Sequence, residues 1–241
     1  MTTTSIKAYN AKRATRYPDI IKVAGYGSYR HMLKNIINGL KYNDIPANPA
    51  ITDLGCGTGN LTKKILNTFP GAEIICVDGS RSMLAQARCN LPTGKITFKL
   101  ADLTSPSFID ALPGSDAVIS SAAIHHLTTG QKNLLFRKIY SRLKPQGIIM
   151  IGDILKGDNN ELTKLYEKFW IDHIAEGIRR YSAKKPDKNN ILQQHRISQM
   201  NEKDRPDTLG RQLLLLKNAG FTNVDCYWKL FGFAVFGGRK R

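Results

Sequence analysis

Short apolar runs rich in β-branched residues alternate with helical stretches from residue 50 onward, and this alternation predicts a parallel sheet covered by helices. The expected strands are 50–54, 73–77, 95–100, 117–120 and 147–151, and the expected helices between them are 60–68, 81–89 and 131–143. After a helix at about 208–219, two further apolar runs predict an antiparallel hairpin joined near Gly232. The 241 residues are enough for one α/β domain with a full core.

Two segments depart from the alternation. Residues 1–45 show helical periodicity after an aromatic and basic beginning, and we expect them to form a helical cover. Residues 155–205 are polar and mostly helical, and an insertion of that length usually packs over one end of the sheet as a cap. We therefore expect a single domain, 1–241, with two helical additions.

The net charge of +17 is spread along the chain. Residues 1–50 carry an excess of +6, residues 51–155 of +4, residues 156–205 of +3 and residues 206–241 of +4. Because these charges form no single basic block, they favour an anionic partner only weakly. A basic surface that keeps the protein in solution explains them equally well.

Neither a membrane span nor a secretory signal is expected. No stretch approaches the roughly 18 consecutive apolar residues of a membrane-spanning helix, and the N-terminus has no apolar core. The cysteines Cys56, Cys76, Cys89 and Cys226 are scattered without CxxC pairing, which argues against a zinc site or a disulfide framework. We therefore expect a cytoplasmic protein without a metal site.

A glycine-rich segment, Asp53-Leu-Gly-Cys-Gly-Thr-Gly59, directly follows the first expected strand. Gly55, Gly57 and Gly59 allow a tight turn and a close approach of the backbone to a ligand. Such a loop alone occurs in many nucleotide-binding folds. Here an acid precedes the first glycine by two positions; it suits a cationic amino-acid ligand and would repel a pyrophosphate.

Acidic residues also follow the next two strands. An acid in Asp78-Gly79-Ser80 can accept hydrogen bonds from both hydroxyls of a ribose. In Ala101-Asp102-Leu103, the acid can accept a hydrogen bond from an adenine amino group, and Leu103 can cover a ring face. Each acid alone is more typical of a helix cap or a loop. Three of them at the carboxyl ends of successive parallel strands indicate a ligand site.

With these motifs the chain resembles a class I S-adenosylmethionine (SAM) dependent methyltransferase, over residues 50–155 and into the C-terminal hairpin. The resemblance implies a Rossmann-like, doubly wound α/β fold with a seven-stranded sheet whose last strand is antiparallel. SAM is the implied cofactor, with Asp53 and the glycines at its methionine portion, Asp78 at the ribose and Asp102 at the adenine. The implied cofactor-binding residues are Asp53, Gly55, Cys56, Gly57, Gly59, Asp78, Gly79, Ser80, Met83, Ala101, Asp102, Leu103, Ser120, Tyr9 and Arg16.

Three further segments extend the resemblance. Residues 120–127 resemble the motif after the fourth strand that borders the reactive methyl group, and residues 9–17 resemble an N-terminal helix that folds over the cofactor. The closing residues 228–238 resemble a branch that includes carboxy-SAM synthase and its methyltransferase relatives. In that synthase an arginine before the Ala-Gly-Phe turn holds the carboxylate of the modified cofactor. The corresponding residue here is Leu215, with Arg211 one helical turn earlier, and this departure favours ordinary methyl transfer.

Methyl transfer needs little chemistry from the protein, because the sulfonium of SAM is already a strong electrophile. If a general base is used, His125 or His126 is the best placed, and Asp153 is a candidate for orienting the acceptor. The alternative is that one histidine packs under the cofactor and the other caps a helix or faces solvent. His173 and His195 would reach the site only if the insertion folds over it.

Three functions remain open. The favoured one is methyl transfer to a small-molecule acceptor, with anionic metabolites among the candidates. The net charge motivates a second, an RNA- or tRNA-modifying methyltransferase, although the chain lacks the Asn-Pro-Pro-Tyr-like sequence common among adenine amino-group methylases. The third is a SAM-binding protein without catalysis, which the near-complete binding motif and the intact segment 120–127 disfavour.

Overall fold

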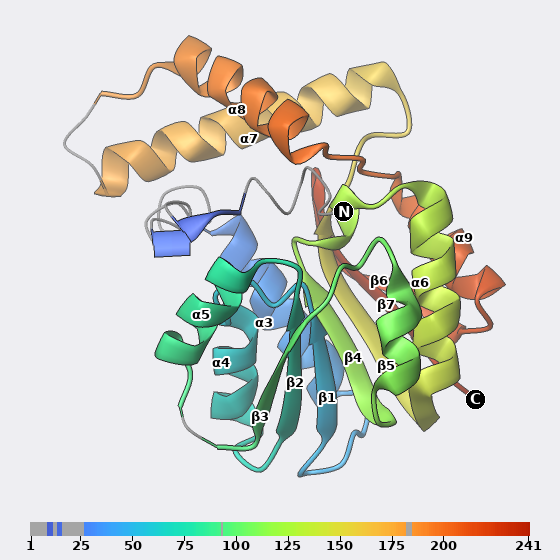
Figure 1. Cartoon of the computed structure of the whole chain (residues 1–241). Coiled ribbons are helices and arrows are strands. Elements are labelled where there is room, and N and C mark those ends of the chain that lie inside the picture. Colours follow the sequence, from blue (N-terminus) through green and yellow to red (C-terminus); the bar gives the residue numbers. More distant parts are fainter. Residues whose placement is uncertain (1–8, 12–13, 16–26, 93, 182–184) are drawn as a thin grey trace.

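The computed structural model describes residues 9–11, 14–15, 27–92, 94–181 and 185–241 (Figure 1). Its centre is a seven-stranded sheet in the order β3-β2-β1-β4-β5-β7-β6. The strands are β1 (Ala50–Leu54), β2 (Glu73–Asp78), β3 (Ile96–Leu100), β4 (Ser115–Ser121), β5 (Leu143–Ile154), β6 (Thr222–Leu230) and β7 (Phe233–Arg239). Strands β1 to β5 pair in parallel, whereas β7 pairs antiparallel with β5 and β6. The predicted doubly wound sheet with an antiparallel last strand is confirmed.

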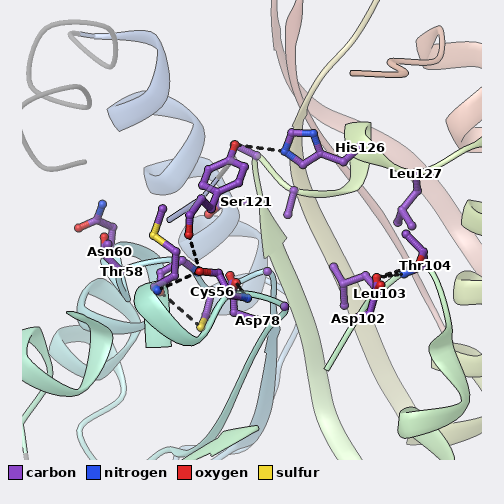
Figure 2. Close-up of a pocket in the computed structure, with 18 of the residues that line it drawn as sticks. Cys56, Thr58, Asn60, Asp78, Asp102, Leu103, Thr104, Ser121, His126 and Leu127 are labelled. Carbon is purple, nitrogen blue, oxygen red and sulfur yellow. Dashed lines mark hydrogen bonds between the residues drawn. The ribbon is translucent and has the colours of Figure 1, made fainter. Parts of the chain in front are cut away.

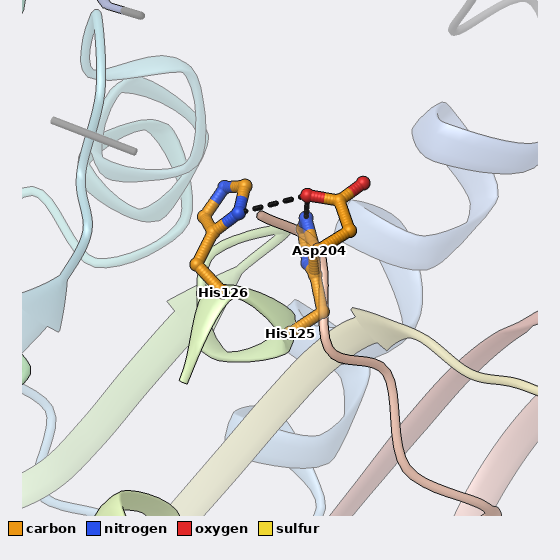
Figure 3. A group of neighbouring side chains, drawn as sticks. All are labelled: His125, His126 and Asp204. Carbon is orange, nitrogen blue, oxygen red and sulfur yellow. Dashed lines mark ion pairs between the residues drawn. The ribbon is translucent and has the colours of Figure 1, made fainter. Parts of the chain in front are cut away.

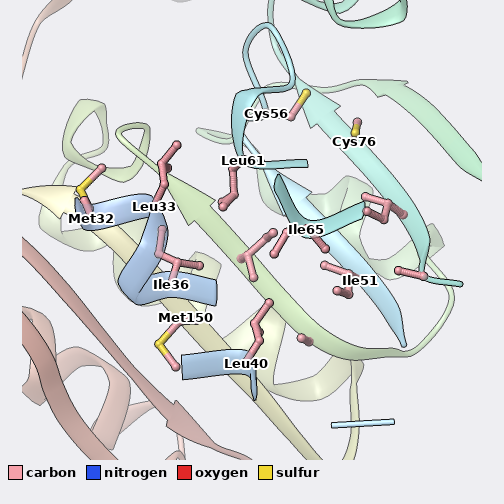
Figure 4. Close-up of a cluster of buried hydrophobic side chains, with 14 of the residues drawn as sticks. Met32, Leu33, Ile36, Leu40, Ile51, Cys56, Leu61, Ile65, Cys76 and Met150 are labelled. Atoms are coloured by element: carbon pink, nitrogen blue, oxygen red, sulfur yellow. The ribbon is translucent and has the colours of Figure 1, made fainter. Parts of the chain in front are cut away.

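Helices cover both faces of the sheet and create two apolar cores (Figure 1). On one face lie α3 (Ser28–Lys41), α4 (Asn60–Thr68) and α5 (Arg81–Asn90), and on the other lie α6 (Thr129–Arg142) and α9 (Leu209–Asn218). Figure 4 shows Ile65 of α4 close to Ile51 of β1, whereas Met32 and Ile36 of α3 lie farther along the sheet, where they border Gly152 of β5. Each fully buried aliphatic side chain contributes about 1.5–3 kcal/mol, so these cores fix the strands that carry the site.

The expected helix 131–143 differs from the structure at both ends. Helix α6 begins at Thr129 because Thr128 and Gln131 form a reciprocal capping box. It ends at Arg142, and β5 begins at once, because Leu143 is buried and pairs with Ser115 of β4. Residues 144–147 then bulge out of the sheet before regular pairing resumes.

The inserted segment forms two helices, α7 (Asn160–Tyr181) and α8 (Lys188–Glu202), which lie over the carboxyl ends of the strands (Figure 1). We call α7 and α8 the cap helices. Aromatic contacts hold α7 on the hairpin: Trp170 packs 5.3 Å from Phe233, and Phe169 stacks 4.1 Å from Phe231. Among the described residues, no helix has the length and apolar character needed to cross a membrane.

Candidate active site

A pocket of about 790 Å³ opens where strands β1 to β4 end (Figure 2). Parallel strands bring their carboxyl ends to one edge, so loops distant in sequence meet there. The residues that line the pocket are Tyr9, Tyr29, Gly55, Cys56, Gly57, Thr58, Asn60, Asp78, Gly79, Ser80, Met83, Asp102, Leu103, Thr104, Ser121, Ala122, Ala123, His126 and Leu127. Eleven of the predicted site residues are among them, from Tyr9 to His126.

The glycine loop forms the floor of the pocket. Gly55 has φ +68°, and a Cβ there would lie 2.3 Å from the side chain of Ala123. Gly57 has φ +54° and faces open space, so a ligand can approach its backbone closely. The amides of Gly55 and Cys56 donate to the carbonyl oxygen of Val77 at 2.8 and 3.0 Å, which ties the loop to β2.

Asp78 lines the pocket at the end of β2. Its carboxylate accepts hydrogen bonds from the amides of Gly57, at 2.9 Å, and Ser80, at 2.8 Å. Burial raises the pKa of Asp78, and the backbone hydrogen bonds partly oppose that shift. The hydroxyl of Ser80 caps α5 by accepting from the amide of Met83. The carboxylate is therefore held rigidly between the glycine loop and the start of α5.

Asp53 lies beneath the loop and not on the pocket wall. Its side chain is fully buried, and one oxygen accepts a 2.6 Å hydrogen bond from the hydroxyl of Thr62. Its other oxygen, Oδ1, has no hydrogen-bond partner among the described residues. Burial, together with the nearby charge of Asp78, raises the pKa of Asp53 to about 7. A neighbouring cation would relieve this buried carboxylate.

The remaining predicted cofactor residues divide by position. Asp102 and Leu103 line the pocket, and the amide and hydroxyl of Thr104 both donate to Asp102. Four other residues lie outside the lining: Asp53, Gly59, Ala101 and Ser120. Ser120 is buried with its hydroxyl donating to the carbonyl oxygen of Leu54, and its neighbour Ser121 reaches the pocket instead. Arg16 lies outside the described residues.

The two predicted histidines have different surroundings. His125 is buried, and its Nδ1 lies 2.6 Å from an oxygen of Asp153, which is also buried. Burial lowers the pKa of His125, but the carboxylate of Asp153 opposes this and the net pKa is raised. His126 lines the pocket, and burial followed by the charge of His125 lowers its pKa. Neither ring caps a helix or faces open solvent.

Asp204, which follows α8, reaches both histidines directly (Figure 3), and Glu202 of α8 reaches His126 through Tyr9. Oδ1 of Asp204 lies 3.0 Å from Nδ1 of His126 and 3.8 Å from Nε2 of His125. The hydroxyl of Tyr9 lies 3.2 Å from Nε2 of His126 and donates to Glu202 at 2.7 Å. A backbone hydrogen bond joins the same two segments: the amide of Arg205, next to Asp204, donates to the carbonyl oxygen of His125.

Sequence reasoning missed several of these residues. Tyr29 of α3 lines the pocket, interacts with Ser121 and Asn60, and has a pKa raised to about 12 by burial. Asn60 could have been found, because it opens the helix after the glycine loop. Asp204 and Glu202 gave no signal, since they lie in a polar stretch far from every motif. Of the insertion's histidines, His195 accepts from Trp170 and His173 stacks on Phe169, and neither lines this pocket.

Comparison with known proteins fits this geometry. A family model described as "Methyltransferase domain" matches residues 51–147. The chain is 27% identical over 237 residues to the carboxy-S-adenosyl-L-methionine synthase of Shewanella amazonensis, a match that covers 94% of this chain and 89% of that protein. The chain belongs to the class I SAM-dependent methyltransferases. SAM is therefore the cofactor of this methyltransferase.

Other relatives match over shorter lengths or in fold alone. The methyltransferase is 33% identical over 107 residues to a trans-aconitate 2-methyltransferase of Variovorax paradoxus, covering 44% of this chain and 39% of that one. The solved structure of human N-acetylserotonin methyltransferase in complex with SAM superposes with a TM-score of 0.61 at 18% identity. That match covers 96% of this methyltransferase and 56% of the human chain, and it shows a shared fold.

Proposed function

We propose that this methyltransferase transfers the methyl group of SAM to a small-molecule acceptor by in-line substitution. The observation that carries the proposal is the continuous pocket from the glycine loop, past Asp78 and Asp102, to His126. One end of this pocket offers carboxylates for the cofactor, and the other offers an imidazole for the acceptor. The protein aligns the two reactants and excludes water, since the sulfonium supplies the electrophile.

Each part of the cofactor has a proposed partner. We assign the ribose to Asp78, whose fixed carboxylate retains free lone pairs, and the adenine to Asp102 and Leu103. The ammonium of the methionine portion is assigned to the region of Asp53, because that buried carboxylate lacks a second partner among the described residues. A cation next to it would favour the ionised form.

The histidine end of the pocket is the proposed place of the acceptor. His126 lines the pocket and is the residue proposed to contact the reacting group of the acceptor. His125 and Asp153 lie behind it as a buried pair and are proposed to position that contact. The cap helices close this end, through Asp204 and Glu202.

Ordinary methyl transfer fits the pocket better than handling of a carboxylated cofactor. Among the described lining residues there is no lysine or arginine to hold an added carboxylate near the sulfonium. Leu215 of α9 is buried in the core, and Arg211 is exposed on the same helix; neither lines the pocket. The support for methyl transfer therefore comes from the lack of lysine and arginine among the described residues that line the cofactor pocket, and not from the residue at position 215.

A second pocket, of about 800 Å³, lies between the cap helices and the hairpin and is the proposed acceptor entrance. Apolar and aromatic side chains, including Trp170 and Phe233, line much of it, with Lys156 and Lys164 among its cations. Its two acids are Glu167, which is paired with Arg196, and Asp204, which faces His126, so both carboxylates have a neighbour other than the lysines. An anionic acceptor with an apolar body matches this lining.

Methyl-labelled SAM tests the proposal. The protein is incubated with labelled SAM and a cell extract, and the products are separated into small-molecule, RNA and protein fractions. We expect the label in the small-molecule fraction, and less of it with Asp78→Ala. SAM binding without label in any fraction would reject the transferase proposal.

A basic face supports RNA as a second candidate acceptor. Helices α3 and α4 contain no acidic residue, and their exposed cations border a groove lined by Arg30, His31, Lys34, Lys41 and Lys64. A groove of this charge suits a phosphate backbone. This function predicts label in the RNA fraction and tRNA binding that weakens steeply with salt.

A reducing compartment, and thus the cytoplasm, is the proposed location. All four cysteines are free, and Cys56 of the glycine loop and Cys76 of β2 are buried next to each other without forming a disulfide. A reducing environment keeps such thiols in that state.

A further inference from the structure

Two histidine nitrogens and one carboxylate oxygen converge at the acceptor end of the pocket (Figure 3). Nε2 of His125, Nδ1 of His126 and Oδ1 of Asp204 all lie within 4.8 Å of one another. The histidines belong to the turn after β4, and Asp204 follows α8, so the cluster joins the sheet to the cap helices. All three side chains are largely buried, with exposed fractions of 5%, 14% and 15%.

The opposite nitrogen of each ring already has a partner. Nδ1 of His125 faces Asp153 at 2.6 Å, and Nε2 of His126 faces the hydroxyl of Tyr9 at 3.2 Å. That hydroxyl donates its own hydrogen to Glu202, so its oxygen accepts from the ring. These contacts place the ring hydrogens on the outer nitrogens. The lone pairs of the inner nitrogens then point toward Asp204, which is the arrangement of metal-binding histidines with supporting acceptors.

Two ring nitrogens and one carboxylate oxygen therefore face one another at the centre of the cluster. Nδ1 of His126 and Oδ1 of Asp204 are both buried and have no hydrogen bond of acceptable geometry within the described part of the chain. Buried acceptors left this way are costly, and a cation at their centre removes the cost.

We propose that His125, His126 and Asp204 bind a divalent transition-metal ion. Two imidazoles and one carboxylate are a common ligand set for ions such as Zn²⁺ and Fe²⁺. Ligand atoms about 2.0–2.2 Å from one such ion are separated by roughly 3.0–3.5 Å. The separations from Asp204 are 3.0 and 3.8 Å, and the two ring nitrogens lie within 4.8 Å of each other, so the rings would have to draw together around the ion.

The position of this site suits an ion that binds the methyl acceptor. His126 lines the cofactor pocket, and Asp204 lines the second pocket under the cap helices. The ion would thus lie in the wall that the two pockets share, and its open positions, held there by His126, would make the contact with the acceptor in place of a ring nitrogen. This step rests on the proposed function and narrows its substrate class to acceptors that offer an oxygen ligand. A divalent ion lowers the pKa of a bound hydroxyl, which prepares it for methylation.

Cobalt titration tests the site directly. The protein is freed of metal with a chelator and titrated with Co²⁺, whose visible absorption reports nitrogen and oxygen ligands, and Zn²⁺ is then added as a competitor. We expect one Co²⁺ per chain, and a Kd raised at least about tenfold by Asp204→Asn and by His126→Gln. His31→Gln is the matched control, because His31 is an exposed histidine of α3 outside the cluster, and it should leave the Kd unchanged.

Binding of SAM, followed by calorimetry, separates this inference from the proposed function. The metal site is rejected if the wild type and Asp204→Asn bind Co²⁺ equally, or if the wild type binds no Co²⁺. If SAM binding and label transfer persist in that case, the proposed function stands. If SAM does not bind at all, the proposed function fails, whatever the Co²⁺ result. Circular dichroism and SAM affinity show whether Asp204→Asn is folded. If it is not folded, the wild type is studied by NMR, where bound Co²⁺ should broaden the imidazole resonances of His125 and His126. Resonances that Co²⁺ leaves unbroadened would reject the metal site.

Discussion

The hydroxyl of Tyr9 donates a 2.7 Å hydrogen bond to Glu202, although the two residues are 193 positions apart in sequence. The backbone carbonyl of Tyr9 also accepts a 2.6 Å hydrogen bond from the hydroxyl of Ser80. Tyr9 thus bridges the start of α5, on the cofactor side, and the end of α8, on the cap side. This bridge encloses the pocket from above, and each of its contacts can be removed separately.

We expect Tyr9→Phe to weaken SAM binding. The substitution keeps the ring and removes the hydrogen bond to a carboxylate, a loss of about 1–2 kcal/mol, or roughly 5- to 30-fold in Kd. Calorimetry with SAM measures the change. Tyr42→Phe is the control, because Tyr42 is 84% exposed. Equal SAM affinities for wild type and Tyr9→Phe would show that the bridge does not hold the cofactor.

Asp78→Ala should weaken SAM binding by about 1–3 kcal/mol, since a charged hydrogen-bond acceptor is lost. The glycine loop should also become more mobile, because the amide of Gly57 loses its partner. Binding of SAM by calorimetry, with Asp110→Ala on the exposed surface as the control, measures the effect. An unchanged affinity would contradict the assignment of Asp78 to the ribose.

The affinity for SAM should rise with pH between about 5.5 and 7.5. The pKa of Asp53 is raised to about 7 by burial, and only its ionised form attracts the ammonium of SAM. Protonated Asp53 stabilises the free protein below about pH 4, and that contribution is lost as the pH rises through 7. Calorimetry across this range should show a slope that Asp53→Asn removes. The same slope in both proteins would place the ammonium elsewhere.

Gly55→Ala should destabilise the protein and abolish SAM binding. The added Cβ would meet the side chain of Ala123 at 2.3 Å, and φ +68° is costly for any residue with a Cβ. Gly210→Ala is the matched control, because a Cβ there meets no atom and Gly210 lies in a helix. We expect the control to raise stability by about 0.5–1 kcal/mol. Thermal unfolding of both variants checks the pair, and similar changes would refute the steric explanation.

Asp207→Ala should lower the free energy of unfolding by about 3–5 kcal/mol, because it leaves a buried charge without its partner. The ammonium of Lys132 is fully buried and pairs with Asp207 at 2.8 Å. This pair anchors the segment after α8 to α6. The exposed pair of Lys138 and Asp110 serves for comparison, and Asp110→Ala should cost about 1 kcal/mol or less. Urea unfolding of the two variants gives both values, and equal losses would contradict the role of burial.

Local patterns predicted the elements that support the cofactor. The run 50–54 and the helix 60–68 coincide with β1 and α4, because their apolar residues repeat with the periods of a strand and a helix. The ends of α6 and β5 were misplaced, since the pairing of Leu143 with Ser115 competes with the turn residues that follow. Propensity is local, whereas strand pairing is decided by a partner elsewhere in the chain.

The sequence by itself determined the fold class and the cofactor, because strand, glycine loop and acid lie within a few residues of one another and parallel strands bring their ends together. The tertiary structure decided the rest of the site. It separated His126, on the pocket wall, from His125, buried against Asp153, and it brought Asp204 and Tyr9 to the two rings. These contacts depend on how the chain returns from the cap helices to the sheet. The packing of Trp170 on Phe233 and the buried ion pair of Lys132 and Asp207 set that path. Both contacts join residues far apart in sequence, so no local pattern encodes them.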